Sequence, residues 1–189
     1  MNKNILKSAF VAVLALTFFS FTNLLVKEVN VKDSKITWKG YKVTGDHEGT
    51  INLASGTLMF EGDKLNGGKF TVDMTTITVT DLTDDSKGKL EGHLKSDDFF
   101  GVETFPTASF VITGVKGSAG KYVVTGDLTI KNKTNPLTFE MTVANNQANA
   151  TLKIDRSKFD VRYGSPSFFN DLKDKAIYDE FDMNVTLMF

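Results

Sequence analysis

The chain has 189 residues, contains no cysteine and carries a formal net charge of −1 at pH 7. Without cysteine it has no disulfides, thiol nucleophiles or thiolate metal sites, and its balanced charge gives no electrostatic reason to expect a nucleic acid as partner. Phenylalanine dominates the aromatic residues, with 16 Phe against one Trp and four Tyr.

The first residues predict an export signal. Lys3 and Lys7 precede an apolar run over residues 10–16, and no further charge appears before Lys27. A basic start followed by such a run is typical of a secretory signal peptide. We therefore expect a signal peptide over residues 1–25, with its cleavage site undetermined, and one domain over residues 26–189. The protein would then be periplasmic or secreted, with no stable membrane insertion after cleavage. An uncleaved anchor is the alternative, since the uncharged stretch just reaches the length of a membrane span.

Apolar and polar residues alternate in most of the remaining chain. A period of two is typical of β-strands with one apolar and one polar face. In chain order, the segments with this pattern lie at residues 36–38, 51–53, 58–60, 70–74, 108–112, 122–130, 137–143, 148–154 and 181–189. Residues 84–100 break the alternation and predict a short helix or turn, with Leu90 and Leu94 on one side.

These segments predict a closed barrel. Consecutive antiparallel strands must close or pack together, because an open sheet leaves unpaired edges. We expect an all-β domain, a single antiparallel barrel of about eight strands with the helical or turn insertion around residues 84–100. Such an interior is either filled by side chains or holds one slender ligand. Alternation leaves both interiors open, and it also allows an outer-membrane barrel with its apolar face outward. The chain is, however, poor in the Trp and Tyr that membrane proteins place at interfaces.

Three sequence blocks follow one another in the body of the chain: "GHLKSDDFFGVETFPTASFVI", "YVVTGDLTIKNKTNPLTF" and "KIDRSKFDV". Together they resemble the YceI-like family of lipid- and polyisoprenoid-binding proteins, and the resemblance extends from about Val29 to Phe189. It implies a lipocalin-like antiparallel barrel, usually exported to the periplasm, with a long isoprenoid, quinone-tail or fatty-acid-like molecule in its pore. The family's frequent "HS" in the opening strand is absent, since "SKITWKG" stands at 34–40, and this departure leaves the identity of the ligand open.

The apolar strand faces and this resemblance together give the candidate ligand-binding residues. They are Trp38, Phe70, Val72, Phe99, Phe100, Phe110, Leu128, Ile130, Phe139, Met141, Leu152 and Ile154. We expect a lipid-like small molecule as partner, with Trp38 and Phe99 or Phe100 nearer an opening. The chain has no framed nucleophile, no glycine-rich phosphate loop and no isolated acid pair, so we expect no catalysis and no cofactor. Whether it forms a homodimer is left open.

Arg156 is the most informative charged residue. It is in phase with the apolar face of residues 150–154, so uninterrupted alternation points its guanidinium inward, where it needs an acceptor. Asp97, Asp98 and Asp155 are the obvious partners. We expect a structural ion pair that fixes residues 93–100 to the barrel, and a contact to the head group of a ligand is the alternative.

His47 and His93 are the only histidines, and each has carboxylates nearby in the sequence. Neither belongs to a metal-binding spacing such as H-x-x-x-H, so we expect no metal site. We expect both side chains to form hydrogen bonds in loops near a barrel end, and a polar role at the mouth of the pore is the alternative.

Overall fold

The computed structural model describes residues 23–189, and most of the expected signal peptide, residues 1–22, lies outside the described residues. Leu24 and Leu25 fall inside the range expected for the signal, yet they pair with Glu61 and Phe60 of another strand. The sheet therefore starts before residue 26, while the cleavage site itself stays a prediction.

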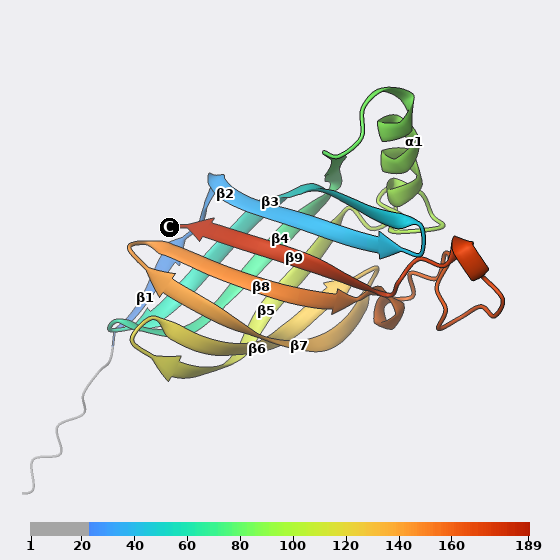
Figure 1. The fold of residues 1–189 in the computed structure, drawn as a ribbon. Coiled ribbons are helices and arrows are strands. Elements are labelled where there is room, and N and C mark those ends of the chain that lie inside the picture. The colour runs from blue at the N-terminus through green and yellow to red at the C-terminus, as the bar shows by residue number, and fades with distance from the viewer. Residues whose placement is uncertain (1–22) are drawn as a thin grey trace, which may run out of the picture.

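Nine strands and one α-helix make up the described part of the chain (Figure 1). The strands are β1 (Leu24–Glu28), β2 (Asn30–Lys42), β3 (Gly45–Glu61), β4 (Lys64–Val79), β5 (Thr107–Ser118), β6 (Lys121–Ile130), β7 (Lys133–Ala144), β8 (Gln147–Asp155) and β9 (Glu180–Met188). The helix is α1 (Asp84–Lys95). Two short 3₁₀ helices, η1 (Arg156–Phe159) and η2 (Lys173–Lys175), lie in the connection between β8 and β9.

The sheet closes on itself through antiparallel pairs. Its order is β3-β2-β9-β8-β7-β6-β5-β4, and β4 pairs again with β3. Strands β1 and β2 pair with the same edge of β3, one after the other along its length. β2 pairs with residues 45–51 and β1 with residues 57–61. The expected all-β, eight-stranded antiparallel barrel is therefore confirmed. Closure pairs the backbone groups that an open sheet would leave exposed.

Strand β3 corrects one expectation. The sequence pattern predicted separate strands at 51–53 and 58–60, whereas residues 45–61 form one strand of 17 residues. Its register with β4 shifts between Thr50 and Asn52 and again between Leu53 and Ser55. Such bulges change which side chains face inward while the pairing of the two strands continues. The alternation of apolar and polar residues is therefore interrupted within β3, although the strand itself is continuous.

The barrel has two different ends (Figure 1). At the hairpin end, two-residue turns join β3 to β4, β5 to β6 and β7 to β8. Asn145 and Asn146, in the last of these turns, both have positive φ, 53° and 57°, as a tight turn that matches the twist of its strands requires. At the helix end lie the β2–β3 turn, α1 with the loop 96–106, and the β8–β9 connection, residues 156–179.

Helix α1 packs against β4 at the helix end, and it confirms the short helix expected within residues 84–100. Its first turn is acidic and its last turn basic, which is the charge order that the helix dipole favours. The carboxylate of Glu91 accepts a hydrogen bond from the amide of Val79 at 2.9 Å and so joins the helix to the end of β4. Leu94 packs against the hydrophobic core.

Candidate ligand-binding cavity

The barrel encloses a cavity of about 210 Å³. It extends from Ala150 and Leu187, toward the hairpin end, to Ile177 and Tyr178 at the helix end. All of the candidate ligand-binding residues line it, namely Trp38, Phe70, Val72, Phe99, Phe100, Phe110, Leu128, Ile130, Phe139, Met141, Leu152 and Ile154. The barrel interior is therefore not completely filled by side chains. Whether these residues bind a ligand stays a prediction.

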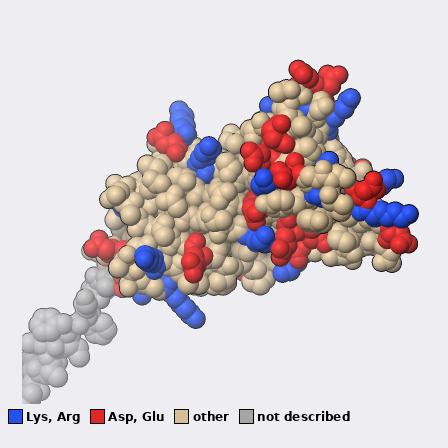
Figure 2. All heavy atoms as spheres, viewed as in Figure 1, with Lys and Arg blue, Asp and Glu red and all other residues tan. Residues whose placement is uncertain are grey.

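The strands turn their apolar faces inward. In β7, Leu137, Phe139 and Met141 line the cavity, while Thr138 and Glu140 between them are exposed. Figure 2 shows that the charged side chains on the visible face gather most densely around the helix end. A barrel embedded in a bilayer needs the opposite arrangement, with an apolar band outside and polar residues inside. The orientation of the strands thus argues against the outer-membrane alternative.

Few polar groups belong to the cavity wall, and protein partners occupy most of them. The indole of Trp38 donates a hydrogen bond to the carbonyl of Thr50 at 3.2 Å. The hydroxyl of Tyr41 donates to the carboxylate of Asp182 at 2.6 Å. The surface that remains for a ligand consists almost entirely of carbon, and such a surface selects apolar molecules because it offers a polar group no partner.

We infer that the cavity opens at the helix end, where Gly40, Tyr41, Ile177 and Tyr178 line it, and we call these four residues the mouth. Among the residues that line the cavity, Tyr178 is the exposed one, with 52% of its surface accessible. Gly40 follows Ile36 and Trp38 on the inward face of β2, and a Cβ added to it would meet no atom within 4 Å. These mouth residues were not among the sequence candidates. Gly40 could have been found from the sequence, because it lies two residues after Trp38 and so on the same face of the strand. Tyr178 lies in the β8–β9 connection, where apolar and polar residues do not alternate.

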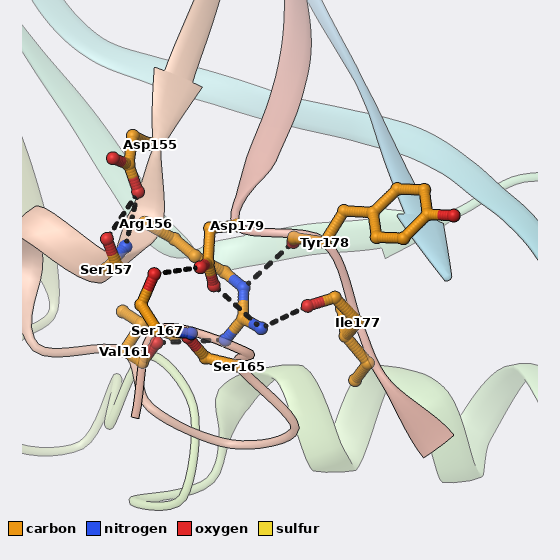
Figure 3. Close-up of polar contacts among 9 residues, drawn as sticks. All are labelled: Asp155, Arg156, Ser157, Val161, Ser165, Ser167, Ile177, Tyr178 and Asp179. Carbon is orange, nitrogen blue, oxygen red and sulfur yellow. Dashed lines mark hydrogen bonds and ion pairs between the residues drawn. The ribbon is translucent and has the colours of Figure 1, made fainter. Parts of the chain in front are cut away.

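Arg156 is buried at the helix end of the cavity, with 2% of its surface exposed. Its guanidinium donates hydrogen bonds to the carbonyls of Val161 at 2.9 Å, Ile177 at 2.9 Å and Tyr178 at 3.2 Å (Figure 3). Nη2 also lies 3.5 Å from Oδ1 of Asp179. Burial lowers the pKa of the guanidinium, and the nearby carboxylates of Asp179 and Asp155 oppose this shift.

The expected partners of Arg156 were wrong, because the ion pair is formed with Asp179. Asp155 instead accepts hydrogen bonds from the amide and hydroxyl of Ser157 at 3.0 and 2.6 Å, and so caps η1. Asp97 and Asp98 line a surface groove outside the barrel. Arg156 therefore holds distant parts of the 156–179 connection together and attaches them to the end of β8. Its contact with the 93–100 segment is with the ring of Phe99, whose centroid lies 5.2 Å from the guanidinium carbon.

The two histidines both lie at the helix end, in different surroundings. Nδ1 of His47 lies 2.8 Å from Oδ2 of Asp81, so the expected hydrogen bond is present. Partial burial raises the pKa of Asp81, but hydrogen bonds from His47 and from the backbone amides of Glu48 and Asp81 outweigh it and lower the pKa. For His93 the expectation was wrong, since its Nε2 is buried without a partner. The segment from 93 to 100 packs through rings instead.

The ring of His93 lies edge-on to Phe99 and Tyr163, with centroids 5.6 and 4.3 Å apart. Phe99 in turn contacts Phe100, with centroids 5.0 Å apart. This series of rings closes the helix end between α1 and the 156–179 connection. Edge-on ring pairs are favourable contacts, so this aromatic seam joins the two parts through packed rings.

No group of three or more His, Asp or Glu within residues 23–189 could hold a metal ion. None of the helices in the described part of the chain is long and apolar enough to cross a membrane.

The YceI-like domain matches residues 28–189 of this chain. The chain belongs to the YceI-like family. Curated relatives of this chain carry the name UPF0312 protein. The match to that of Shewanella denitrificans is 36% identical over 94 residues, 49% of this chain and 47% of the relative. The match to that of Pseudomonas putida is 33% identical over 111 residues, 58% of this chain and 54% of the relative. The matched region thus spans about half the length of these relatives.

Solved YceI-like structures share the barrel. BcnA of Burkholderia cenocepacia superposes with a TM-score of 0.68 at 27% identity, covering 85% of this chain and 99% of BcnA. A polyisoprenoid binding domain from Saccharophagus degradans, implicated in plant cell wall breakdown, gives 0.59 at 12% identity, covering 87% and 97%. The YCEI protein of Campylobacter jejuni gives 0.55 at 16% identity, covering 98% and 96%. At such identities the last two support the fold alone.

Proposed function

We propose that this YceI-like protein is an exported binding protein that holds one long apolar molecule in its barrel. The observation that carries this proposal is the cavity, whose wall the inward strand faces build from carbon along the barrel. The molecule would be an isoprenoid, a quinone tail or a fatty-acid-like lipid. The Saccharophagus degradans domain of the same fold, described as binding polyisoprenoid, supports this class of ligand.

The size of the cavity favours a slender chain over a bulky ligand. Its volume, about 210 Å³, lies below the range of roughly 300–1,000 Å³ that is typical of sites for drug-sized molecules. Each methylene that moves from water into such a wall contributes roughly 0.8 kcal/mol. An extended hydrocarbon chain therefore gains affinity with every carbon that fits between the mouth and the hairpin end.

The proposed role is to hold and protect the molecule without changing it. The indole of Trp38 and the hydroxyl of Tyr41 at the wall are bonded to other protein groups. The guanidinium of Arg156 is likewise bonded to carbonyls of the 156–179 connection. The basic and apolar start of the chain supports export to the periplasm or the medium. Transport, storage and protection under stress would all use the same cavity.

Native mass spectrometry of the protein, followed by extraction into organic solvent, tests this function. We expect one lipid-like molecule per chain, which extraction removes and a matching lipid restores. A folded sample that neither carries a lipid nor takes up a long-chain fatty acid or polyprenol would contradict the proposal. It would favour a barrel that stays empty.

A further inference from the structure

The helix end carries a group of exposed apolar side chains, which we call the apolar rim. Tyr178, Val43, Tyr163 and Phe169 are about half exposed, at 52%, 51%, 49% and 49%, and Phe168 is 39% exposed. Val43 lies in the β2–β3 turn, and the others lie in the 156–179 connection. Exposed apolar side chains that gather at one end of a protein mark a surface that contacts a membrane, another protein or a ligand.

The apolar rim is continuous with the mouth of the cavity. Tyr178 belongs to both, because it lines the cavity and is exposed. Backbone hydrogen bonds hold the two parts of the rim together, from the amide of Val43 to the carbonyl of Ala176 at 3.1 Å and from the amide of Tyr178 to the carbonyl of Tyr41 at 2.8 Å. A surface that touches the rim therefore also touches the opening.

We propose that the apolar rim rests on a lipid bilayer, so that the ligand passes between the bilayer and the cavity without crossing water. This inference depends on the proposed function, because it gives the route of the same ligand. The side chains of the rim suit an interface between water and lipid, where tyrosine places its ring among apolar groups and its hydroxyl in water. A long apolar ligand would otherwise have to expose its whole chain to water during release.

The charges around the rim favour a zwitterionic or neutral bilayer surface over an anionic one. The charges of the 156–179 connection nearly cancel, since Lys158, Arg162, Lys173 and Lys175 stand against Asp160, Asp171 and Asp174. Asp97, Asp98 and Lys131, which line a surface groove together with Tyr163 and Phe169, complete the balance. Figure 2 shows both signs side by side around this end of the molecule. Attraction between basic clusters and anionic lipid is therefore a minor part of the contact. The guanidinium of Arg162 lies 5.0 Å from the ring of Phe168, so it can stay in water while the ring meets lipid.

The other exposed apolar side chains do not share this position. Leu24, Leu25 and Val26 lie in β1 at the hairpin end, on the far side of the barrel from the mouth. Val111 and Val123 lie on the barrel wall in β5 and β6. Val111 and Val123 thus supply a matched control, because they expose apolar surface that lies away from the mouth.

Flotation with phosphatidylcholine vesicles tests the inference. We expect the full, lipid-loaded protein to float with the vesicles, with little loss at high salt and little gain when phosphatidylglycerol is added. The double variant Phe168→Ser with Phe169→Ser should reduce the bound fraction roughly tenfold. The matched control Val111→Ser with Val123→Ser should bind as the unchanged protein does. Val43→Ser gives an independent rim variant if the double variant melts at a lower temperature.

Three results would overturn the inference. The unchanged protein could fail to bind the vesicles. The rim would then have another partner, such as a protein. The rim and wall variants could bind equally. Binding could require anionic lipid and disappear in salt. Native mass spectrometry of the same samples separates this failure from failure of the proposed function, since rim variants that keep their lipid leave ligand binding intact.

Discussion

The guanidinium of Arg156 lies 3.5 Å from the carboxylate of Asp179, and neither side chain is exposed to solvent by more than 13%. The two residues belong to the two ends of the 156–179 connection, and Arg156 also binds three carbonyls of that connection. The hydroxyl of Ser167 donates to the same carboxylate at 2.6 Å. One buried cation therefore organises the connection that forms part of the cavity mouth.

Replacing Arg156 by alanine should destabilise the protein strongly. The change leaves Asp179 as a buried charge without its partner and leaves carbonyls without donors, which typically costs about 3–5 kcal/mol. Urea unfolding measures the loss. The control is Arg162→Ala, whose ion pair with Asp160 is exposed and should contribute less than about 1 kcal/mol. If Arg156→Ala kept its stability but lost its lipid, the guanidinium would be a head-group contact and the structural role would be wrong.

The sequence predicted the barrel well because the alternation of apolar and polar residues can be read within each strand separately. Strands such as β7 have one face lining the cavity and one face in water, so period-two alternation records the fold directly. The same pattern placed Phe139 and Met141 on the cavity wall. It failed in β3, where bulges shift the register within one continuous strand.

The partner of Arg156 could not be predicted from alternation, because the chain leaves the strand at that residue and enters η1. The useful signal was the pairing of β8 with β9. Asp155 lies opposite Glu180, so the residue before Glu180 lies beside Arg156, and the amide of Arg156 indeed donates to the carbonyl of Asp179 at 2.9 Å. The mouth residue Tyr178 lies in the same connection, where no repeating pattern sets the position of a side chain.

Acid should weaken the contact at Asp182 near the mouth. Its hydrogen bond from Tyr41 lowers its pKa most, and although partial burial raises the pKa, a hydrogen bond from Lys153 lowers it further. Because the folded-state pKa lies below the unfolded value of about 3.9, this contact stabilises the protein above that pH and is lost as the pH falls through the folded-state pKa. Asp182→Asn should therefore flatten the fall in stability below about pH 4. The effect should stay under about 1 kcal/mol, because the pair is partly exposed.

Urea unfolding at a series of pH values measures this flattening. The matched control is Asp127→Asn, an exposed strand carboxylate without a hydrogen bond among the described residues. If the free energy of unfolding depended on pH equally in Asp182→Asn and in the unchanged protein, the contacts of Asp182 would not stabilise the fold.

A methyl group at Gly126 should disturb the cavity wall at Phe110. A Cβ at this glycine would lie 2.7 Å from Cε2 of Phe110 and 2.5 Å from the carbonyl oxygen of Val111, so the ring or the strand must move. Overpacking of this kind costs about 1–3 kcal/mol. Gly126→Ala should lower the unfolding free energy by that amount. Gly114→Ala in β5, where a Cβ meets nothing within 4 Å, is the control and should be neutral or slightly stabilising. Equal stability of the two variants would mean that Phe110 has room to turn away.

Filling the mouth at Gly40 should slow ligand exchange while leaving the fold intact. Gly40 lines the cavity, and an added Cβ would have no atom within 4 Å, so we expect a leucine at this position to project toward the opening. Replacing a strand glycine is itself neutral or stabilising by up to about 1 kcal/mol. Stopped-flow uptake of a fluorescent long-chain fatty acid by delipidated protein should therefore be slower for Gly40→Leu, with a melting temperature that is unchanged or slightly raised. Gly114→Leu, which adds the same side chain away from the cavity, should match the unchanged protein. Uptake that is equally fast in both variants would place the opening elsewhere, and the seam between Phe99 and Tyr163 would be the next position to block.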